Sequence, residues 1–184
     1  MRAIVRGGRQ VLEPSAEKTK IHQEDLLPKG AVGMSESFVS ERDHLQGLHW
    51  QCFGCGQENR LGLRLNIRLV GDRTECTFTP IAEFQGPPGV THSGVIAAVL
   101  DEVMSQLIYA QLQLAVTRKI EVTYRRPLRV GQTYYFTAWI AKQNTRIIAA
   151  KAEARDAEGN QVARARGIFA PMDEERVARF LDQE

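Results

Sequence analysis

Residues 93–112 read SGVIAAVLDEVMSQLIYAQL, and this stretch decides the fold. It predicts a helix roughly 30 Å long at a rise of 1.5 Å per residue. Apolar residues lie nearly all round that helix, which is typical of a helix enclosed by other elements. Asp101 interrupts the apolar run at its centre. A carboxylate is costly to bury unless it is paired or hydrogen-bonded, so Asp101 is a candidate functional residue.

Strand patterns lie on both sides of this helix. Upstream, LGLRLNIRLV at 61–70 alternates with period two, and TECTFTP at 74–80 follows after a turn. Downstream, four further strands are predicted at 117–127, 132–142, 146–156 and 161–170, and a short helix at 173–181. One long helix and a mostly antiparallel sheet predict an α+β domain.

Composition limits the class of protein. Residues 1–45 are polar and irregular, so we expect an N-terminal extension followed by one domain at 46–184. With 24 basic and 22 acidic residues, the charge is too even to favour nucleic acid or a membrane as partner. The three cysteines, an odd number, argue against a disulfide framework. With no secretory signal and no uninterrupted apolar run of about 18 residues, we expect a cytoplasmic protein without a transmembrane helix.

The start of the predicted helix offers a second functional feature. His92, Ser93 and Gly94 precede or open the helix, where the first backbone N–H groups have no partners within it. Such groups can hold an anion or a developing oxyanion. Asp101 lies seven residues beyond Gly94, about 10 Å along the axis, so the two features cannot meet at one carbonyl within one chain. Two antiparallel copies of the helix across a two-fold axis bring them together.

This hypothesis divides the helix into two sides. The first side is predicted to face the sheet and carries Val95, Ile96, Val99, Val103 and Leu107. The second side is predicted to face a partner helix and carries Gly94, Ala97, Asp101, Met104, Ser105 and Ile108. Two alternatives for Asp101 are a hydrogen-bonded structural carboxylate and, if the helix is rotated, a solvated carboxylate. The neighbouring Glu102 is predicted to be solvated.

Four segments in order resemble the hotdog-fold acyl-CoA thioesterases, in particular the phenylacetate-pathway thioesterase-like branch. They are CFGCGQENRLGLRL at 52–65, GPPGVTHSGVIAAVLDEVMSQL at 86–107, TRKIEVTYRRPLRVGQTYYFTAWI at 117–140 and DAEGNQVARARGIF at 156–169. The resemblance covers roughly residues 50–170. It implies an antiparallel sheet wrapped around one long helix, in a homodimer or dimer of dimers with active sites at the subunit interface.

The resemblance also implies roles for individual residues. Asp101 matches the carboxylate that activates water as a general base or attacks the thioester itself, and Thr117 matches a hydroxyl residue that positions the water or the carboxylate. Ser93 replaces the first glycine of a His-Gly-Gly motif, whose N–H polarises the thioester carbonyl, and His92 orients the loop or the carbonyl. Gly86 stands where some relatives carry an amide side chain, so that contact is expected to be absent.

Substrate binding is predicted from charge and from position on the helix. Arg125, Arg126 and Arg146 are candidates for the phosphates of coenzyme A, which arginine binds well. Met104 and Ile108 are predicted to line an apolar tunnel for the acyl group. No cofactor is expected, since the CoA thioester is the substrate.

Two other functions stay open. One is a non-catalytic acyl-CoA-binding or regulatory protein. The other is a hotdog hydratase or dehydratase, which usually pairs an Asp with a His about five residues later; position 106 is Gln, which argues against it.

A CxxC motif formed by Cys52 and Cys55, with His44 and His49 nearby, raises the possibility of zinc. Strong zinc motifs have four ligands in two paired clusters, and a redox CxxC normally opens a helix in a βαβ unit. The sequence therefore favours structural packing of these cysteines, and we expect no metal ion.

Overall fold

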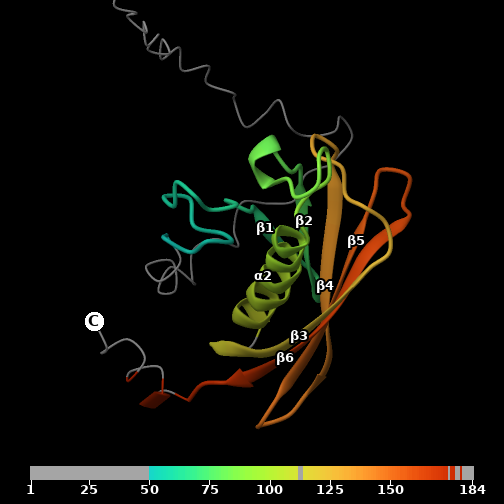
Figure 1. Ribbon diagram of the computed structural model, residues 1–184. Helices are drawn as coiled ribbons and strands as arrows, with labels where there is room; N and C mark the ends of the chain where they lie inside the picture. The colour runs from blue at the N-terminus through green and yellow to red at the C-terminus, as the bar shows by residue number, and fades with distance from the viewer. Residues whose placement is uncertain (1–49, 112–113, 174, 177–178, 180–184) are drawn as a thin grey trace, which may run out of the picture. The chain divides into compact units, whose positions relative to one another are not determined.

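A six-stranded antiparallel sheet curves around one long helix (Figure 1). The computed structural model describes residues 50–111, 114–173, 175–176 and 179. The predicted extension at 1–45 and the two histidines near the CxxC motif lie outside these residues. Of the predicted C-terminal helix, only residues 173, 175, 176 and 179 are described, and the last three are helical.

The strand order across the sheet is β1-β2-β4-β5-β6-β3, and every neighbouring pair is antiparallel. The elements are β1 (Ile67–Val70), β2 (Arg73–Phe78), the 3₁₀ helix η3 (Ala82–Phe84), α2 (Ser93–Gln111), β3 (Ala115–Tyr124), β4 (Tyr134–Gln143), β5 (Ile148–Arg155) and β6 (Gln161–Pro171). The helix therefore falls between the second and third strands of the chain, and it packs against all six strands. This architecture confirms the predicted α+β class and the hotdog fold.

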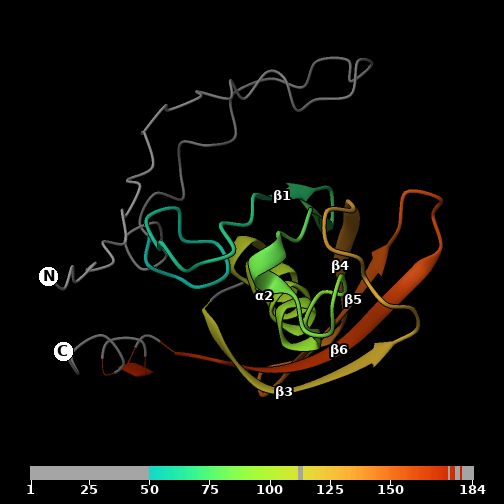
Figure 2. The same cartoon turned by 45° about the horizontal axis from the view of Figure 1, so that its top comes forward.

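The helix α2 forms the centre of the core. Figure 2 shows the sheet curving around it. Among its residues, Val99, Leu100, Val103 and Leu107 have no exposed surface. By length and composition alone, α2 is apolar enough to cross a membrane, a property that buried core helices share. Its burial against the sheet accounts for that apolar character.

The two predicted sides of α2 need correction. Met104 and Ile108, assigned to the side facing a partner, are fully buried within this chain. A side-chain atom added to Gly167 on β6 would lie 3.1 Å from Cε of Met104, so this methionine packs directly on the sheet. The curved sheet contacts α2 with all six of its strands, so buried residues lie on both predicted sides of the helix. The side left partly uncovered carries Gly94, Ala98 and Asp101.

The first predicted strand is shorter than expected. The alternation at 61–70 predicts one continuous strand, but β1 begins only at Ile67. Leu63 and Leu65 are buried as the period requires, yet their N–H groups donate to the carbonyls of Phe53 and Gly54 instead of to a strand. Leu61 is 82% exposed. The apolar alternation marks burial here, while hydrogen bonding to the loop at 50–57 takes this segment out of the sheet.

Candidate active site

The loop before α2 sets the conformation of the helix start. The Thr91 N–H donates to the carbonyl of Leu128 at 2.8 Å, and the His92 N–H donates to the carbonyl of Phe84 at 2.8 Å. The His92 carbonyl then accepts the first helical hydrogen bonds, from Val95 at 3.0 Å and Ile96 at 3.3 Å. His92 is thus the N-cap residue and Ser93 is the first residue of the helix.

The two predicted oxyanion donors are not equivalent. The Gly94 N–H donates to Nδ1 of His92 at 3.0 Å, so this donor is already used. The Ser93 N–H has no acceptor among the described residues. A side-chain carbon on Gly94 would lie 3.0 Å from the same imidazole nitrogen, so the glycine makes room for the ring of His92. The geometry leaves Ser93 as the available donor and makes His92 and Gly94 its support.

Tyr124, at the end of β3, also holds the helix start. Its hydroxyl donates to the carbonyl of Ser93 at 2.8 Å. Sequence reasoning missed this residue, because nothing local to β3 indicates that its end meets the first residue of α2. Only the curvature of the sheet brings the two together.

Asp101 pairs with Thr117, as the resemblance suggested. The Thr117 hydroxyl donates to Oδ1 of Asp101 at 3.1 Å. Thr117 lies on β3 directly before a register shift in its pairing with β6. Partial burial raises the pKa of the Asp101 carboxyl above its ordinary value; the Thr117 hydrogen bond opposes this and the charge of Glu102 adds to it. The pair is a hydrogen-bonded carboxylate at the uncovered side of α2.

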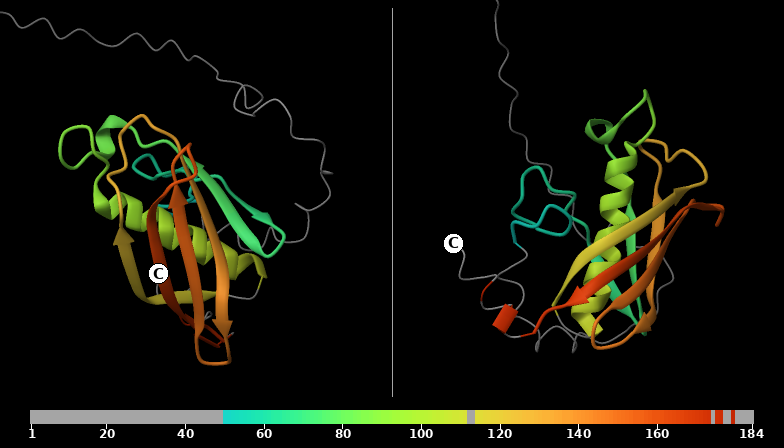
Figure 3. Two further views of the ribbon diagram at one scale, coloured as in Figure 1. Left: turned by 90° about the vertical axis from the view of Figure 1, so that its right-hand side faces the viewer. Right: turned by 60° about the horizontal axis from the view of Figure 1, so that its bottom comes forward.

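Asp101 and the helix start contact opposite ends of β3. Thr117 and Tyr124 are seven residues apart on this strand, a span of about 23 Å at the rise of a strand. Along α2, Ser93 and Asp101 are separated by about 12 Å. Figure 3 shows β3 running alongside α2. Within one chain the two functional features therefore stay apart, as the helix geometry alone predicted.

An open pocket of about 310 Å³ adjoins the helix start. It is lined by Val90, Thr91, Ser93, Ile96, Tyr124, Arg125, Arg126, Pro127 and Leu128. The hydroxyl oxygen of Thr91 is buried there and has no hydrogen-bond partner among the described residues. The pocket thus combines apolar walls with two guanidinium groups and unpaired polar atoms.

The three predicted phosphate-binding arginines do not form one cluster in the chain. Arg125 and Arg126 both follow β3, and their N–H groups donate to the carbonyl of Val162. Arg126 also lies 4.0 Å from Asp156. Arg146 is in the turn before β5, where its N–H donates to Asn144. The strand register puts this turn at the same end of the sheet as Thr117, with β6 between β5 and β3, and away from the pocket.

The prediction that Glu102 is solvated is wrong. This residue is half-buried beneath the loop at 50–57, where the thiol of Cys52 donates to its two oxygens at 3.8 and 3.7 Å. Gln106, one helical turn later, donates to Oε1 of Glu102 at 3.0 Å. Burial raises the pKa of the nearby Cys55 thiol, and Glu102 increases the shift. The loop, which sequence reasoning placed only by resemblance, covers this side of α2.

The comparisons with known proteins agree with the architecture. The family profile of the thioesterase superfamily matches residues 88–163, from the loop before α2 into β6. A curated relative is acyl-coenzyme A thioesterase THEM5 of Mus musculus, 28% identical over 156 residues, which are 74% of this chain and 62% of that protein. The chain thus spans less than two thirds of the length of this relative.

Solved structures show the same fold. A crystal structure of a thioesterase superfamily protein aligns with a TM-score of 0.63 at 22% identity, covering 80% of this chain and 70% of that one. PaaI of E. coli, from the phenylacetic acid degradation operon, aligns with a TM-score of 0.56 at 21% identity, covering 59% of this chain and 83% of that one. The protein is therefore of the hotdog class. The profile match over residues 88–163 confirms the resemblance to the thioesterase superfamily seen in the sequence, and the PaaI structure is consistent with the branch named there.

Proposed function

We propose that this protein hydrolyses the thioester of an acyl-coenzyme A to a free acid and coenzyme A. The observation that carries the proposal is the half-buried Asp101 carboxylate, held by the Thr117 hydroxyl at 3.1 Å, on the helix that also presents the Ser93 N–H. Asp101 acts as general base toward water, or as nucleophile. The Ser93 N–H donates a hydrogen bond to the thioester carbonyl oxygen and stabilises the negative charge that develops there.

The chemistry suits so small a site. A thiolate is a good leaving group, so a strong general acid is not needed and no cofactor takes part. One carboxylate contributes on the order of 10²–10⁴-fold as a general base. One well-placed oxyanion donor contributes on the order of 10²–10³-fold.

The pocket at the helix start supports coenzyme A as the ligand. Arg125 and Arg126 lie beside Ser93, and guanidinium groups suit phosphate oxygens. A related fold from Streptococcus mutans, with a TM-score of 0.56 at 14% identity over 59% of this chain and 88% of that one, was solved bound to acetyl-CoA. Two curated relatives, from Mus musculus and Homo sapiens, carry the name acyl-coenzyme A thioesterase THEM5.

The proposed active unit is a homodimer, or a dimer of dimers, with two shared sites. Each site takes Asp101 from one subunit and Ser93 from the other, since the two features lie at opposite ends of β3 within a chain. A two-fold axis beside the uncovered side of α2 satisfies this requirement twice.

The test is thiol release from a panel of acyl-CoA esters by wild type and by Asp101→Asn. Hydrolysis by wild type and loss of at least about 100-fold in kcat in the variant support the proposal. If wild type binds CoA esters and hydrolyses none, the protein is an acyl-CoA-binding protein instead. Full activity of Asp101→Asn would remove this residue from the mechanism.

A mixing experiment tests the shared site. Ser93→Pro removes the backbone donor, and proline is tolerated at the first position of a helix; Ser93→Ala is the control that keeps the N–H. A heterodimer of Asp101→Asn with Ser93→Pro contains one intact site. Random mixing should restore about one quarter of wild-type activity, because half of the dimers are mixed and each has one of two sites. No recovery in verified heterodimers would place each site within one chain.

A further inference from the structure

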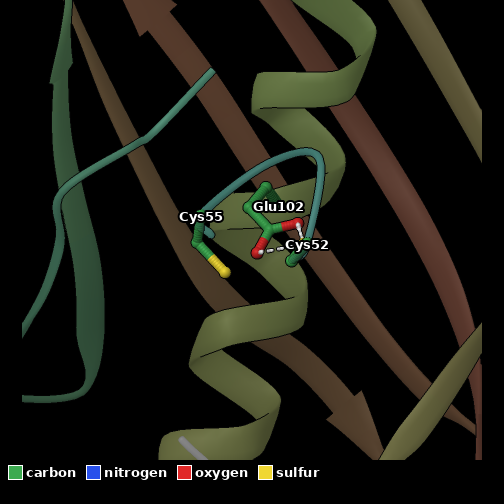
Figure 4. Close-up of side chains that lie close together, drawn as sticks. All are labelled: Cys52, Cys55 and Glu102. Atoms are coloured by element: carbon green, nitrogen blue, oxygen red, sulfur yellow. Dashed lines mark hydrogen bonds between the residues drawn. The ribbon is translucent and has the colours of Figure 1, made fainter. Parts of the chain in front are cut away.

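Cys52, Cys55 and Glu102 form a cluster that the proposed hydrolysis does not use. Figure 4 shows the two cysteines on the loop at 50–57, directly over Glu102 on α2. The sulfur atoms and a carboxylate oxygen all lie within 4.8 Å of one another. None of the three residues is fully buried or fully exposed. Two distant segments of the chain therefore bring three potential metal ligands to one point.

The loop is shaped to hold both sulfur atoms. The Gly54 N–H donates to Sγ of Cys52 at 3.3 Å, and the Gly56 N–H donates to the Cys52 carbonyl at 3.0 Å. A side-chain carbon on Gly54 would come within 2.4 Å of the Glu102 carboxylate, so only glycine permits this approach. On Gly56 the same atom would lie 2.4 Å from the carbonyl of Trp50. The tight turn and the close carboxylate both depend on these glycines.

The segment at 61–66, which precedes β1 and is not part of the sheet, holds the loop in place by hydrogen bonds. Leu63 donates to the Phe53 carbonyl at 2.7 Å, and Leu65 donates to the Gly54 carbonyl at 2.9 Å. The side chains of both leucines are buried in the core. Core packing therefore positions the CxxC turn over α2, and this explains why Leu63 and Leu65 alternate without forming a strand.

In the part of the chain that the structure describes, the cluster has no cationic partner. No lysine, arginine or histidine within the described part of the chain forms an ion pair with Glu102. Gln106 is the amide that contacts the cluster among the described residues: its Nε2 donates to Oε1 of Glu102 at 3.0 Å and to Sγ of Cys55 at 3.2 Å. A half-buried carboxylate beside two thiols, with an amide that orients the carboxylate and one sulfur, is the arrangement of ligands around a cation.

We propose that Cys52, Cys55 and Glu102 bind a zinc ion, with water as the fourth ligand and Gln106 orienting the site. In a tetrahedral zinc site with Zn–S of about 2.3 Å and Zn–O of about 2.0 Å, sulfur and oxygen ligands lie about 3.5 Å apart. The Cys52 sulfur lies 3.8 and 3.7 Å from the two Glu102 oxygens. The longest separation in the cluster is below 4.8 Å, so binding requires a contraction of about 1 Å toward the sulfur spacing of about 3.8 Å.

Binding releases two protons, one from each thiol, to solvent, and Glu102 contributes a carboxylate oxygen to the ion. Thiolate ligands select zinc over magnesium or calcium, which prefer oxygen alone. The ion joins the loop to α2 one residue away from Asp101. Its role is structural, since it fastens the loop at 50–57 to α2 beside the residue that carries the proposed chemistry.

The test measures metal directly and does not depend on activity. Full-length protein, purified under reducing conditions and dialysed against zinc-free buffer, is analysed for zinc by elemental mass spectrometry. A second sample, stripped with a chelator, is titrated with Co²⁺. We expect about one zinc per chain and a sulfur-to-cobalt charge-transfer band. No stoichiometric zinc together with no charge-transfer band would overturn the proposal.

Variants assign the ligands. Cys55→Ser and Glu102→Gln should each reduce retained zinc to well below one per chain, whereas Cys76→Ala, which changes a thiol of β2 outside the cluster, should retain it. Zinc retained equally by all three would show adventitious binding and overturn the site. A mass two hydrogens lower with loss of titratable thiols, restored by reductant, would make the pair a disulfide switch and also overturn it. Zinc content, the cobalt band and the thiol count do not depend on catalysis, so they test the zinc site even if the protein shows no thioesterase activity.

Discussion

Replacing Thr117 with valine tests the pairing that supports the proposed mechanism. Valine keeps the branched shape on β3 but removes the hydroxyl that donates to Oδ1 of Asp101 at 3.1 Å. Without this donor the carboxylate loses its fixed orientation toward water. The expected result is a lower kcat with little change in KM, because Thr117 is not among the residues that line the pocket at the helix start.

The magnitude follows from the kind of hydrogen bond. A hydrogen bond to a charged group contributes about 1.5–3 kcal/mol, which corresponds to roughly 10- to 150-fold in rate. The Thr117–Asp101 bond is solvent-accessible in the chain, and solvent competes with it, so we expect a loss near the lower end, about tenfold. Initial rates of thiol release with the preferred acyl-CoA give kcat and KM.

Two controls separate positioning from folding. Thr117→Ser keeps the hydroxyl and should keep most of the activity. Thr123→Val makes the same change at another exposed threonine of β3 and should leave the kinetics unchanged. If Thr117→Val stays within about twofold of wild type while Asp101→Asn is inactive, the carboxylate does not need this hydroxyl and the argument for a positioned pair fails.

Three further changes test the scaffold. Leu107→Ala should lower the free energy of unfolding in urea by about 2–5 kcal/mol, because Leu107 is fully buried and truncation leaves a cavity; a loss below about 1 kcal/mol would mean that α2 is not at the core. Thr74→Val should cost about 1 kcal/mol in the same measurement by removing the buried 2.6 Å hydrogen bond from its hydroxyl to the Val103 carbonyl, and Thr74→Ser should not. The pKa of Glu153 is lowered from 4.5 because hydrogen bonds, chiefly from Arg155, outweigh the effect of partial burial. Its stabilisation is therefore present above pH 4.5 and lost as the pH falls below that value, so Glu153→Gln should flatten the acid decline of stability, and an unchanged decline would contradict this reading.

Local patterns were enough to predict the helix and most strands. An apolar run of helical length, bounded by Ser93 and Gln111, has one way to bury itself when strands surround it in the sequence. The prediction of a strand at 61–66 was wrong because period-two burial does not specify a hydrogen-bond partner. There the partner is a loop, reached through Phe53 and Gly54, and no local signal encodes it.

The candidate site also has features that the sequence predicts and features that only the structure shows. Asp101 and the helix start were visible from the sequence, because an acid in an apolar helix and an unpaired helix terminus are local features. The loss of Gly94 as a donor was not visible, since it depends on the rotamer of His92. The solvated position expected for Glu102 was wrong, since the covering loop is 50 residues away in the chain.

The sequence by itself determined the order of the elements, the central helix and the separation of Asp101 from Ser93, because helix rise and side-chain periodicity depend only on the chain. The tertiary structure decided that Tyr124 holds Ser93, that Met104 and Ile108 belong to the core, and that Cys52 and Cys55 lie over Glu102. These contacts join segments far apart in the chain. The curvature of the sheet and the packing of the loop at 50–57 determine them, and neither has a period that can be recognised in one sequence.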